Sequence, residues 1–358
     1  ALPLIVGMIL AAGLDSASVL VMFGATQIAT GIWYRMPMPV QPLKAMATIV
    51  ITQKLTGNVL YGGGLAIGVL MLVLTGTRLV EWLARITPVV VIRGIQFGLG
   101  LQLATLALRE YVRAEGVPGY VLAAVAFLAT LALMGNRRYP AALAVIILGI
   151  VYAALFTLRT DALLAGVGLR WPRLFVPTMS DALTGLLVLA LPQLPLSLGN
   201  SILATQQSAR DFFPGRPLTV RKISATYAAM NLIQPFFSGV PVCHGSGGLV
   251  GHYTFGGRTG GSVIIYGSLY VLLGLFLSEG FDAAIRIFPL PVLGVLLLFE
   301  GLALMTLLAR LPNLEMDLAV ALLVGVIAGS VPYGYVVAMA LGMLLASPVG
   351  RARVRLAR

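Results

Sequence analysis

The stretch SGVPVCHGSGGLVGHYTFGGRTG, residues Ser238–Gly260, lies between two strongly apolar segments although it is itself polar and rich in glycine. It contains the one cysteine of the chain, Cys243, and both histidines, His244 and His252. Inside a bilayer, irregular polar backbone of this kind is tolerated only where it is buried in protein or lines a polar cavity. The stretch therefore predicts a polar cavity within a membrane protein.

The composition of the whole chain also predicts a membrane protein. Of the 358 residues, 59% are hydrophobic and 10% are charged, whereas a soluble protein carries about 25% charged residues. The apolar blocks are roughly 15–25 residues long, which favours helices over a β-barrel. We therefore expect an all-α polytopic membrane protein with no large soluble domain.

We expect fourteen transmembrane segments. The third and the tenth are half-helices, each preceded by a short extended segment, because proline suits the start of a helix and not its interior. The segments span residues 1–12, 17–34, 39–53, 58–76, 87–108, 119–134, 140–158, 181–205, 219–236, 242–254, 261–278, 287–308, 314–329 and 332–347. The first segment starts within an apolar run, so we expect it to be a truncated helix.

The two halves of the chain repeat short patterns at nearly constant spacing. Pro39–Val40 recurs as Pro241–Val242, 202 residues later, and Pro88 recurs as Pro289, 201 residues later. Seven segments per half is an odd number, so the second half must enter the membrane from the opposite side. This predicts 7+7 inverted repeats, an arrangement in which interrupted segments at matching positions mark a transporter binding site.

The distribution of basic residues indicates how the chain is oriented in the membrane. The chain has 24 Lys and Arg against 12 Asp and Glu, a net charge of +12. The basic residues lie singly or in pairs at segment ends, which is explained by membrane topology, and we expect no nucleic-acid partner. With both termini cytoplasmic, 15 basic residues fall on the cytoplasmic side and 7 on the other, as the positive-inside rule requires. Residues 351–358 then form a basic cytoplasmic tail.

The starts of the two half-helices predict an anion site. Each start offers unpaired backbone N–H groups and the positive end of a helix dipole, and two such ends facing one another bind anions well. The surrounding side chains are donors, and neither motif contains a carboxylate. We expect a small oxyanion as ligand and no cofactor. The expected substrate-binding residues are Gln41, Pro42, Lys44, Gln193, Cys243, His244, Gly245, Ser246 and Gly247.

Some of these residues fit a second interpretation. Lys44 is as consistent with an ion pair to a buried acid as with a contact to the ligand. Structural roles are consistent with three further residues: Cys243 as a small buried residue, His244 as a structural cap, and His252 as a partner in a structural hydrogen bond. Each alternative places the residue in the framework of the site instead of against the ligand.

Glu300 is the acidic residue that lies deep within an expected helix. Ionisable groups inside a membrane are functional candidates by default. Two roles are consistent with Glu300. It carries a coupling proton, or it forms an ion pair with Arg93, which lies in the corresponding segment of the first half. Both residues are our candidates for coupling or gating.

Metal binding and enzyme chemistry are not expected. One cysteine and two histidines lack the number and spacing of a usual metal site. Adjacent residues of a helix point about 100° apart, so Cys243 and His244 do not form a nucleophile–base pair.

Three stretches resemble a known family. PMPVQPLKAMA (residues 37–47) and VPVCHGSGGLVGHYTFGGRTG (residues 240–260) resemble the two signature motifs of the molybdate transporter family, and LPQLPLSLGNS (residues 191–201) resembles a further segment of it. That family is grouped with the sulfate permease superfamily and has a uracil-permease-like fold. The resemblance covers nearly the whole chain.

The resemblance implies a substrate-carrying core domain, residues 1–76 and 178–278, that moves in an elevator-like step against a gate domain, residues 77–160 and 283–350. The expected function is secondary active transport of a tetrahedral oxyanion, with molybdate first, sulfate or tungstate as related substrates, and a proton as the driving ion. The alternatives are a sulfate transporter of the same fold and an anion channel. We expect a multi-pass protein of the bacterial inner membrane, and a homodimer is a compatible assembly.

Overall fold

The computed structural model describes residues 2–86, 88–136, 141–156, 167–254, 257–311, 314–331 and 334–346. The expected basic tail, residues 351–358, lies outside the described residues. The elements of the first half are α1 (Leu2–Ala12), α2 (Ser16–Tyr34), β1 (Val40–Pro42), α3 (Lys44–Gln53), α4 (Gly57–Gly76), α5 (Leu79–Ile86), α6 (Val89–Leu106), η1 (Ala107–Tyr111), α7 (Gly116–Leu133) and α8 (Ala141–Phe156).

The second half begins with one long helical run. Its elements are α10 (Met179–Gly185), η2 (Leu186–Ala190), α11 (Leu191–Leu196), η3 (Ser197–Leu203), α12 (Ala204–Phe212), α13 (Val220–Ile233), η4 (Gln234–Phe237), β2 (Val242–His244), α14 (Ser246–Thr254), α15 (Gly261–Phe276), α16 (Ser278–Ile287), α17 (Leu290–Met305), η5 (Thr306–Arg310), α18 (Leu314–Ser330) and α19 (Gly334–Leu345). Here η1, η2 and η3 are π-helical, and η4 and η5 are 3₁₀ turns.

Local signals explain where several helices begin. The carboxylate of Asp15 accepts a hydrogen bond from the amide of Ser18 at 2.9 Å and so caps α2. Thr178 and Asp181 form a reciprocal capping box at the start of α10, which satisfies amides that have no partner within the helix. Both α6 and α17 begin directly after a proline, Pro88 and Pro289.

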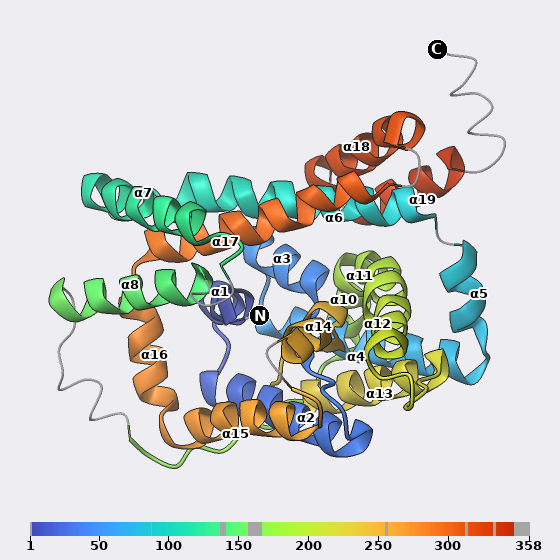
Figure 1. Cartoon of the computed structure of the whole chain (residues 1–358), viewed down its shortest axis with the longest axis horizontal. Helices are drawn as coiled ribbons and strands as arrows, with labels where there is room; N and C mark the ends of the chain where they lie inside the picture. The colour runs from blue at the N-terminus through green and yellow to red at the C-terminus, as the bar shows by residue number, and fades with distance from the viewer. Residues whose placement is uncertain are drawn as a thin grey trace.

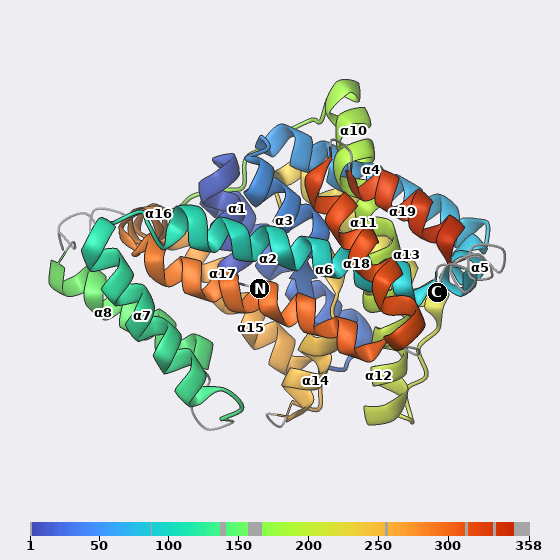
Figure 2. The ribbon, with the colours of Figure 1, turned by 90° about the horizontal axis from the view of Figure 1, so that it is seen from above.

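The helices fall into two groups, and the smaller group forms a layer that lies across the larger one (Figure 1). The layer contains α6, α7, α17 and α18, and α6 packs against both α17 and α18. On the other side, α2 packs against α15, and α4 packs against α10 and α13. Seen from above, α6 and α17 run side by side over the rest of the molecule (Figure 2). Every one of these pairings joins a helix of the first half to helices of the second half.

Small residues allow the closest of these approaches. A Cβ added at Gly24 of α2 would lie 2.5 Å from the carbonyl oxygen of Gly267 of α15. Such a distance is a clash, so this crossing requires glycine. Close backbone approach through small residues is typical of helix pairs in membranes.

The outer surface is apolar where the helices lack neighbours. Val117 and Leu128 on α7, and Leu143 and Leu155 on α8, are more than half exposed. Six described helices are long and apolar enough to cross a membrane, and they span Ser16–Tyr34, Gly57–Gly76, Val89–Tyr111, Gly116–Leu133, Met179–Phe212 and Leu290–Ala309. Exposed apolar side chains on such helices suit contact with lipid.

Two helices were not expected from the sequence. The short helices α5 and α16 follow α4 and α15, and they lead into α6 and α17. Each has an acidic residue in its first turn, Glu81 in α5 and Glu279 in α16. The sequence did not indicate them because each is short and mixes polar with apolar residues between two long apolar segments.

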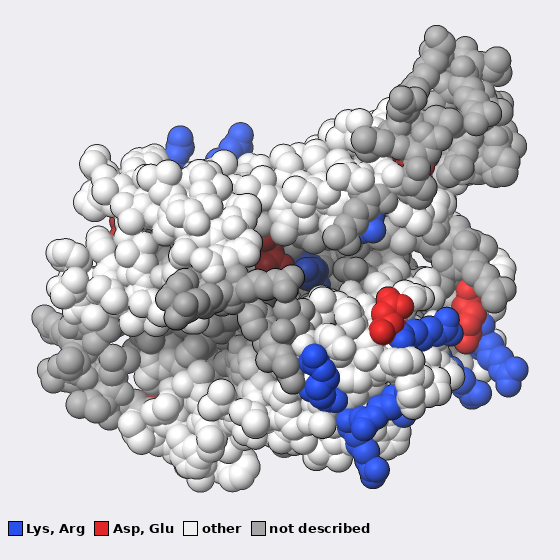
Figure 3. Space-filling model, viewed as in Figure 1, with Lys and Arg blue, Asp and Glu red and all other residues white. Residues whose placement is uncertain are grey.

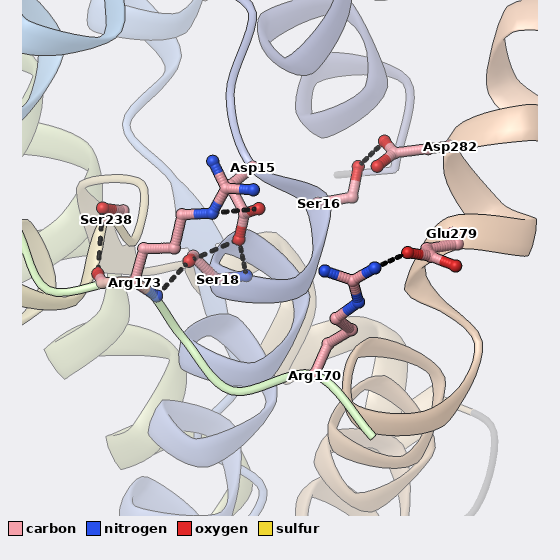
Figure 4. A network of polar contacts seen from close by, with 8 residues as sticks. All are labelled: Asp15, Ser16, Ser18, Arg170, Arg173, Ser238, Glu279 and Asp282. Atoms are coloured by element: carbon pink, nitrogen blue, oxygen red, sulfur yellow. Dashed lines mark hydrogen bonds and ion pairs between the residues drawn. The ribbon is translucent and has the colours of Figure 1, made fainter. Parts of the chain in front are cut away.

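An extended segment around Arg173 ties several elements together at one end of the molecule (Figure 4). Arg173 Nε lies 3.1 Å from Oδ1 of Asp15, at the start of α2. The hydroxyl of Ser238 donates to the carbonyl oxygen of Arg173 at 3.0 Å. Nearby, Arg170 forms an ion pair with Glu279 of α16. The segment that leads to α10 is thus fixed to α2, to the residue after η4 and to α16.

Candidate functional site

The two short strands bring the half-helix starts together. Strands β1 and β2 pair antiparallel, with Gln41 opposite Cys243. The amide of Leu43 donates to the carbonyl oxygen of Pro241 at 3.0 Å, which extends the pairing by one bond. The half-helices α3 and α14 begin two residues after their strands, at Lys44 and Ser246. The starts of both half-helices therefore flank one small sheet.

Two amide side chains hold this sheet in the same way. Gln27 of α2 donates from Nε2 to the carbonyl oxygen of Val40 at 2.8 Å, and its Oε1 accepts from the amide of Val40 at 2.9 Å. Asn231 of α13 does the same for Val242, at 2.7 and 3.0 Å. All four residues are fully or almost fully buried. We did not expect a role for either amide from the sequence. The feature that could have indicated one is a polar side chain inside an otherwise apolar helix.

A cavity of about 250 Å³ lies beside the sheet. It is lined by eight of the nine expected binding residues, namely Gln41, Lys44, Gln193, Cys243, His244, Gly245, Ser246 and Gly247. The ninth, Pro42, is buried in β1 opposite Val242. Pro42 therefore belongs to the sheet that supports the cavity.

The opposite wall comes from the layer of long helices. Gln96 and Leu99 of α6, Ala303 and Leu304 of α17, and Leu307 of η5 line this wall. Leu196 and Ser201, from the long run that contains α11 and η3, complete the lining. Of these unexpected residues, Gln96 had a usable signal as an amide inside an apolar segment. The aliphatic residues had none, since only the packing of two layers places them at the cavity.

Lys44 is the cation at the cavity, and it pairs with Glu300. Its Nζ lies 3.4 Å from Oε1 of Glu300 on α17, and both side chains are partly exposed. A basic and an acidic side chain lie together in the hollow between the two groups of helices, apart from the charged side chains that gather at the lower right (Figure 3). The sequence made Arg93 a candidate partner of Glu300. In the structure Glu300 pairs with Lys44 instead, because α17 meets the start of α3 at this point. The guanidinium of Arg93 donates to Oε1 of Gln96 at 2.8 Å.

Gln193 caps α3. Its Oε1 accepts from the amide of Ala45 at 2.9 Å and from the amide of Met46 at 3.4 Å. Its Nε2 donates to Ser197 Oγ at 3.1 Å, and Ser197 in turn lies 2.7 Å from the hydroxyl of Tyr227. Gln193 thus lines the cavity while it satisfies amides that we had expected to face an anion. The ammonium of Lys44 remains as a side-chain donor at this end of the site.

The first turn of α14 is shaped by glycine. A Cβ at Gly245 would lie 2.5 Å from Cδ of Gln41, so a larger residue there would displace the Gln41 side chain. At Gly247, in contrast, no atom lies within 4 Å of an added Cβ. Gly247 lines the cavity, so its missing side chain leaves open space beside the first amides of a helix, which have no acceptor within that helix. This turn is suited to cradle an oxyanion.

Cys243 and His244 belong to a strand, which corrects the expectation of a helix at these positions. Successive side chains of a strand point to opposite faces, so the two still do not form a nucleophile–base pair. His244 Nε2 lies 2.7 Å from the hydroxyl of Thr226, and its ring packs edge-on against Tyr34. The imidazole therefore joins β2 to α13 and α2 while His244 also lines the cavity.

The remaining histidine also has a structural partner. Nδ1 of His252 lies 3.2 Å from the hydroxyl of Ser262. Within the described ranges, no group of three or more His, Cys, Asp or Glu side chains is placed to hold a metal ion. The polar groups around the cavity are suited to hydrogen-bond an anion.

The sequence matches known proteins over most of its length. Residues 1–103 and 185–304 match a family model described as a molybdate transporter of the MFS superfamily. Molybdate transporter 2 of Arabidopsis thaliana is 32% identical over 352 residues, covering 85% of this chain and 75% of that protein. Molybdate transporter 1 of the same plant is 31% identical, covering 90% and 80%. Molybdate transporter 1 of Chlamydomonas reinhardtii is 25% identical, covering 85% and 80%.

Solved structures show the same fold at low identity. The transmembrane domain of the cyanobacterial bicarbonate transporter BicA matches with a TM-score of 0.66 at 16% identity, covering 97% of this chain and 93% of that one. The murine anion transporter Slc26a9 in its inward-facing state matches with a TM-score of 0.68 at 14% identity, covering 96% and 65%. The fold is therefore that of the BicA and Slc26a9 structures. This chain is an integral multi-pass membrane protein that belongs to the molybdate transporter family.

Proposed function

We propose that this protein is a secondary active transporter of a tetrahedral oxyanion, with molybdate as the first candidate. The observation that carries the proposal is the cavity between the two half-helix starts, where Lys44 and the open first turn of α14 converge. A tetrahedral dianion accepts hydrogen bonds on every side, and this lining supplies an ammonium, hydroxyls, side-chain amides and backbone amides. The family relationship to molybdate transporters adds support.

The second part of the proposal is elevator-type alternating access in a 7+7 inverted repeat. The core domain is residues 1–76 and 178–278, and the gate domain is residues 77–160 and 283–350. The matching clamps support the repeat, because Gln27 and Asn231 hold Val40 and Val242 through the same two bonds. The position of the cavity, with walls from both groups of helices, supports movement of one group against the other.

The third part is coupling to a proton through Glu300. Uptake of a dianion against an inside-negative potential needs a driving ion, since each charge costs about 2.3 kcal/mol per 100 mV. An oxyanion in the cavity competes with Glu300 for Lys44, and the released carboxylate then takes up a proton. The exchange replaces one ion pair by another and neutralises Glu300, and the second charge of the dianion is left to the hydroxyls and amides that line the cavity.

The orientation is also a proposal. Both termini lie on the cytoplasmic side, as the distribution of basic residues requires. The relatives named above come from a plant and a green alga, so they do not support a bacterial inner membrane in particular.

Uptake of radiolabelled molybdate into proteoliposomes that contain the full-length protein tests the proposal. We expect saturable uptake that increases when the side of entry is acidified and that tungstate inhibits. Sulfate as competitor separates the two substrate assignments: stronger inhibition by sulfate than by unlabelled molybdate favours the sulfate transporter. Flux that does not saturate and ignores the pH gradient favours an anion channel and contradicts the proposal.

A further inference from the structure

A second polar cavity lies at the far end of α3. Its volume is about 430 Å³. Thr52 and Gln53 at the end of α3, Gln102 and Thr105 of α6, and Arg109 of η1 are among its lining residues. The first cavity meets the start of α3 at Lys44. The half-helix, ten residues long, therefore runs from one polar cavity to the other, a distance of about 15 Å at 1.5 Å per residue.

A polar face of α3 connects the two cavities. Lys44, Thr48 and Thr52 follow one another at four-residue spacing, which places them in one row along the helix. Thr48, between the cavities, has no exposed surface, and its hydroxyl has no hydrogen-bond partner in the described structure. A buried hydroxyl without a partner is costly, by about 1–3 kcal/mol. The row is therefore suited to form the wall of a path in which a polar ligand would pair with Thr48.

Two contacts close the far end of this row. Lys54, the residue directly after α3, forms an ion pair with Glu110 of η1, with Nζ 2.9 Å from Oε2. The hydroxyl of Thr52 lies 3.5 Å from Oε1 of Gln102. Both contacts join α3 to the layer that contains α6. Half-helix α3 is thus held to that layer by an ion pair at each end, through Lys44 and through Lys54.

We propose that the second cavity is the far opening of the transport path. When α3 moves away from the layer that contains α6, the oxyanion passes between this opening and the first cavity along the row Lys44–Thr48–Thr52. The Lys54–Glu110 pair is the gate at this opening. The inference rests on the proposed function. It adds the route, its midpoint and the residues that close it.

The charges explain why such a gate suits an anion. While Lys54 is paired with Glu110, the closed gate is electrically neutral, and Arg109 is the cation in the cavity wall. Separation of α3 from η1 breaks the pair and leaves Glu110 beside Arg109, its neighbour on η1, while Lys54 moves with α3. Lys54, Glu110 and Arg109 together keep a net positive charge at this opening, where an oxyanion enters or leaves. The pair is largely exposed, with side chains 65% and 50% accessible, so solvent screening keeps it weak enough to open.

Cysteine accessibility tests this route. The native Cys243 is buried but lines the first cavity, so the labelling of the parent protein, with and without Glu110→Gln, is measured as the background and subtracted. Thr48→Cys is nearly isosteric, and it is labelled in sealed proteoliposomes with a negatively charged, membrane-impermeant methanethiosulfonate reagent. Thr105→Cys, in the wall of the second cavity, reports the fraction of protein whose second cavity faces the reagent.

We expect Thr48→Cys to react slowly and Thr48→Cys combined with Glu110→Gln to react at least tenfold faster. The matched control is Thr48→Cys with Glu115→Gln. Glu115 is an exposed acid that lies four residues beyond Tyr111, the last residue of η1, and this variant should react as slowly as Thr48→Cys alone. The charge exchange Lys54→Glu with Glu110→Lys should return the rate toward the slow value.

Two results would overturn the proposal. The first is an unchanged labelling rate of Thr48→Cys when Glu110→Gln is added. The second is equal acceleration by Glu110→Gln and by Glu115→Gln, which would indicate general loosening. The readout does not depend on the substrate, so it separates failure of this route from failure of the proposed function, which the molybdate uptake assay tests on its own.

Discussion

Lys44 of α3 and Glu300 of α17 form an ion pair across the boundary between the two groups of helices, at the edge of the cavity. The pair joins the start of a half-helix to the layer that faces it. Any shift of one group against the other changes the distance between these two charges. The pair therefore connects what happens in the cavity to the relative position of the two groups.

Replacement of Lys44 should weaken substrate binding. A hydrogen bond to a charged group contributes about 1.5–3 kcal/mol, so Lys44→Ala should raise the Kd for molybdate by roughly 10- to 100-fold. Isothermal titration calorimetry on the purified protein measures this change. Arg221→Ala, which removes an exposed cation from α13, should leave Kd unchanged. Equal Kd values for Lys44→Ala and the wild-type protein would show that Lys44 does not contact the oxyanion.

Replacement of Glu300 should separate binding from proton coupling. Glu300→Gln keeps the size of the side chain but removes the group that takes up a proton, so downhill uptake should persist while an acidic entry side no longer stimulates it. Uptake with and without an imposed pH gradient checks this. If the gradient stimulates the variant as strongly as the wild-type protein, Glu300 does not carry the coupling proton.

The two glycines at the start of α14 should respond differently to alanine. Gly247→Ala fills open space in the cavity, so it should weaken molybdate binding at least tenfold with little change in Tm. Gly245→Ala places a Cβ against Gln41, and overpacking of this kind costs about 1–3 kcal/mol, so it should lower Tm. Thermal unfolding in detergent and molybdate titration compare the two. A reversed pattern would contradict the assigned roles.

The two amide clamps should be needed for stability. Gln27→Ala or Asn231→Ala leaves buried backbone groups of β1 or β2 without partners, at about 1–3 kcal/mol per group. Both variants should lower Tm, whereas Asn58→Ala, at an exposed position of α4, should not. Tm values of both clamp variants that match that of Asn58→Ala would show that the sheet does not depend on the clamps.

The sequence allowed prediction of features that depend on local chemistry. Prolines and glycines marked the two interrupted segments, and eight of the nine expected residues line one cavity. Long apolar runs indicated the helices. The short helices α5 and α16 escaped notice because they are neither long nor uniformly apolar.

Features that depend on packing could not be predicted. Ala303 and Leu304 line the cavity only because α17 lies against the starts of the two half-helices. The partner of Glu300 depends on which helix faces α17 at that depth, and residues 256 positions apart in sequence meet there. The capping role of Gln193 likewise depends on the approach of α11 to α3.

The most direct test of the central claim is molybdate uptake into proteoliposomes by the wild-type protein and by Lys44→Ala. We predict saturable, pH-gradient-stimulated uptake by the wild-type protein and a large loss of uptake at low molybdate concentration in the variant. Absence of saturable uptake by the full-length wild-type protein, or equal uptake by the two proteins, would contradict the account.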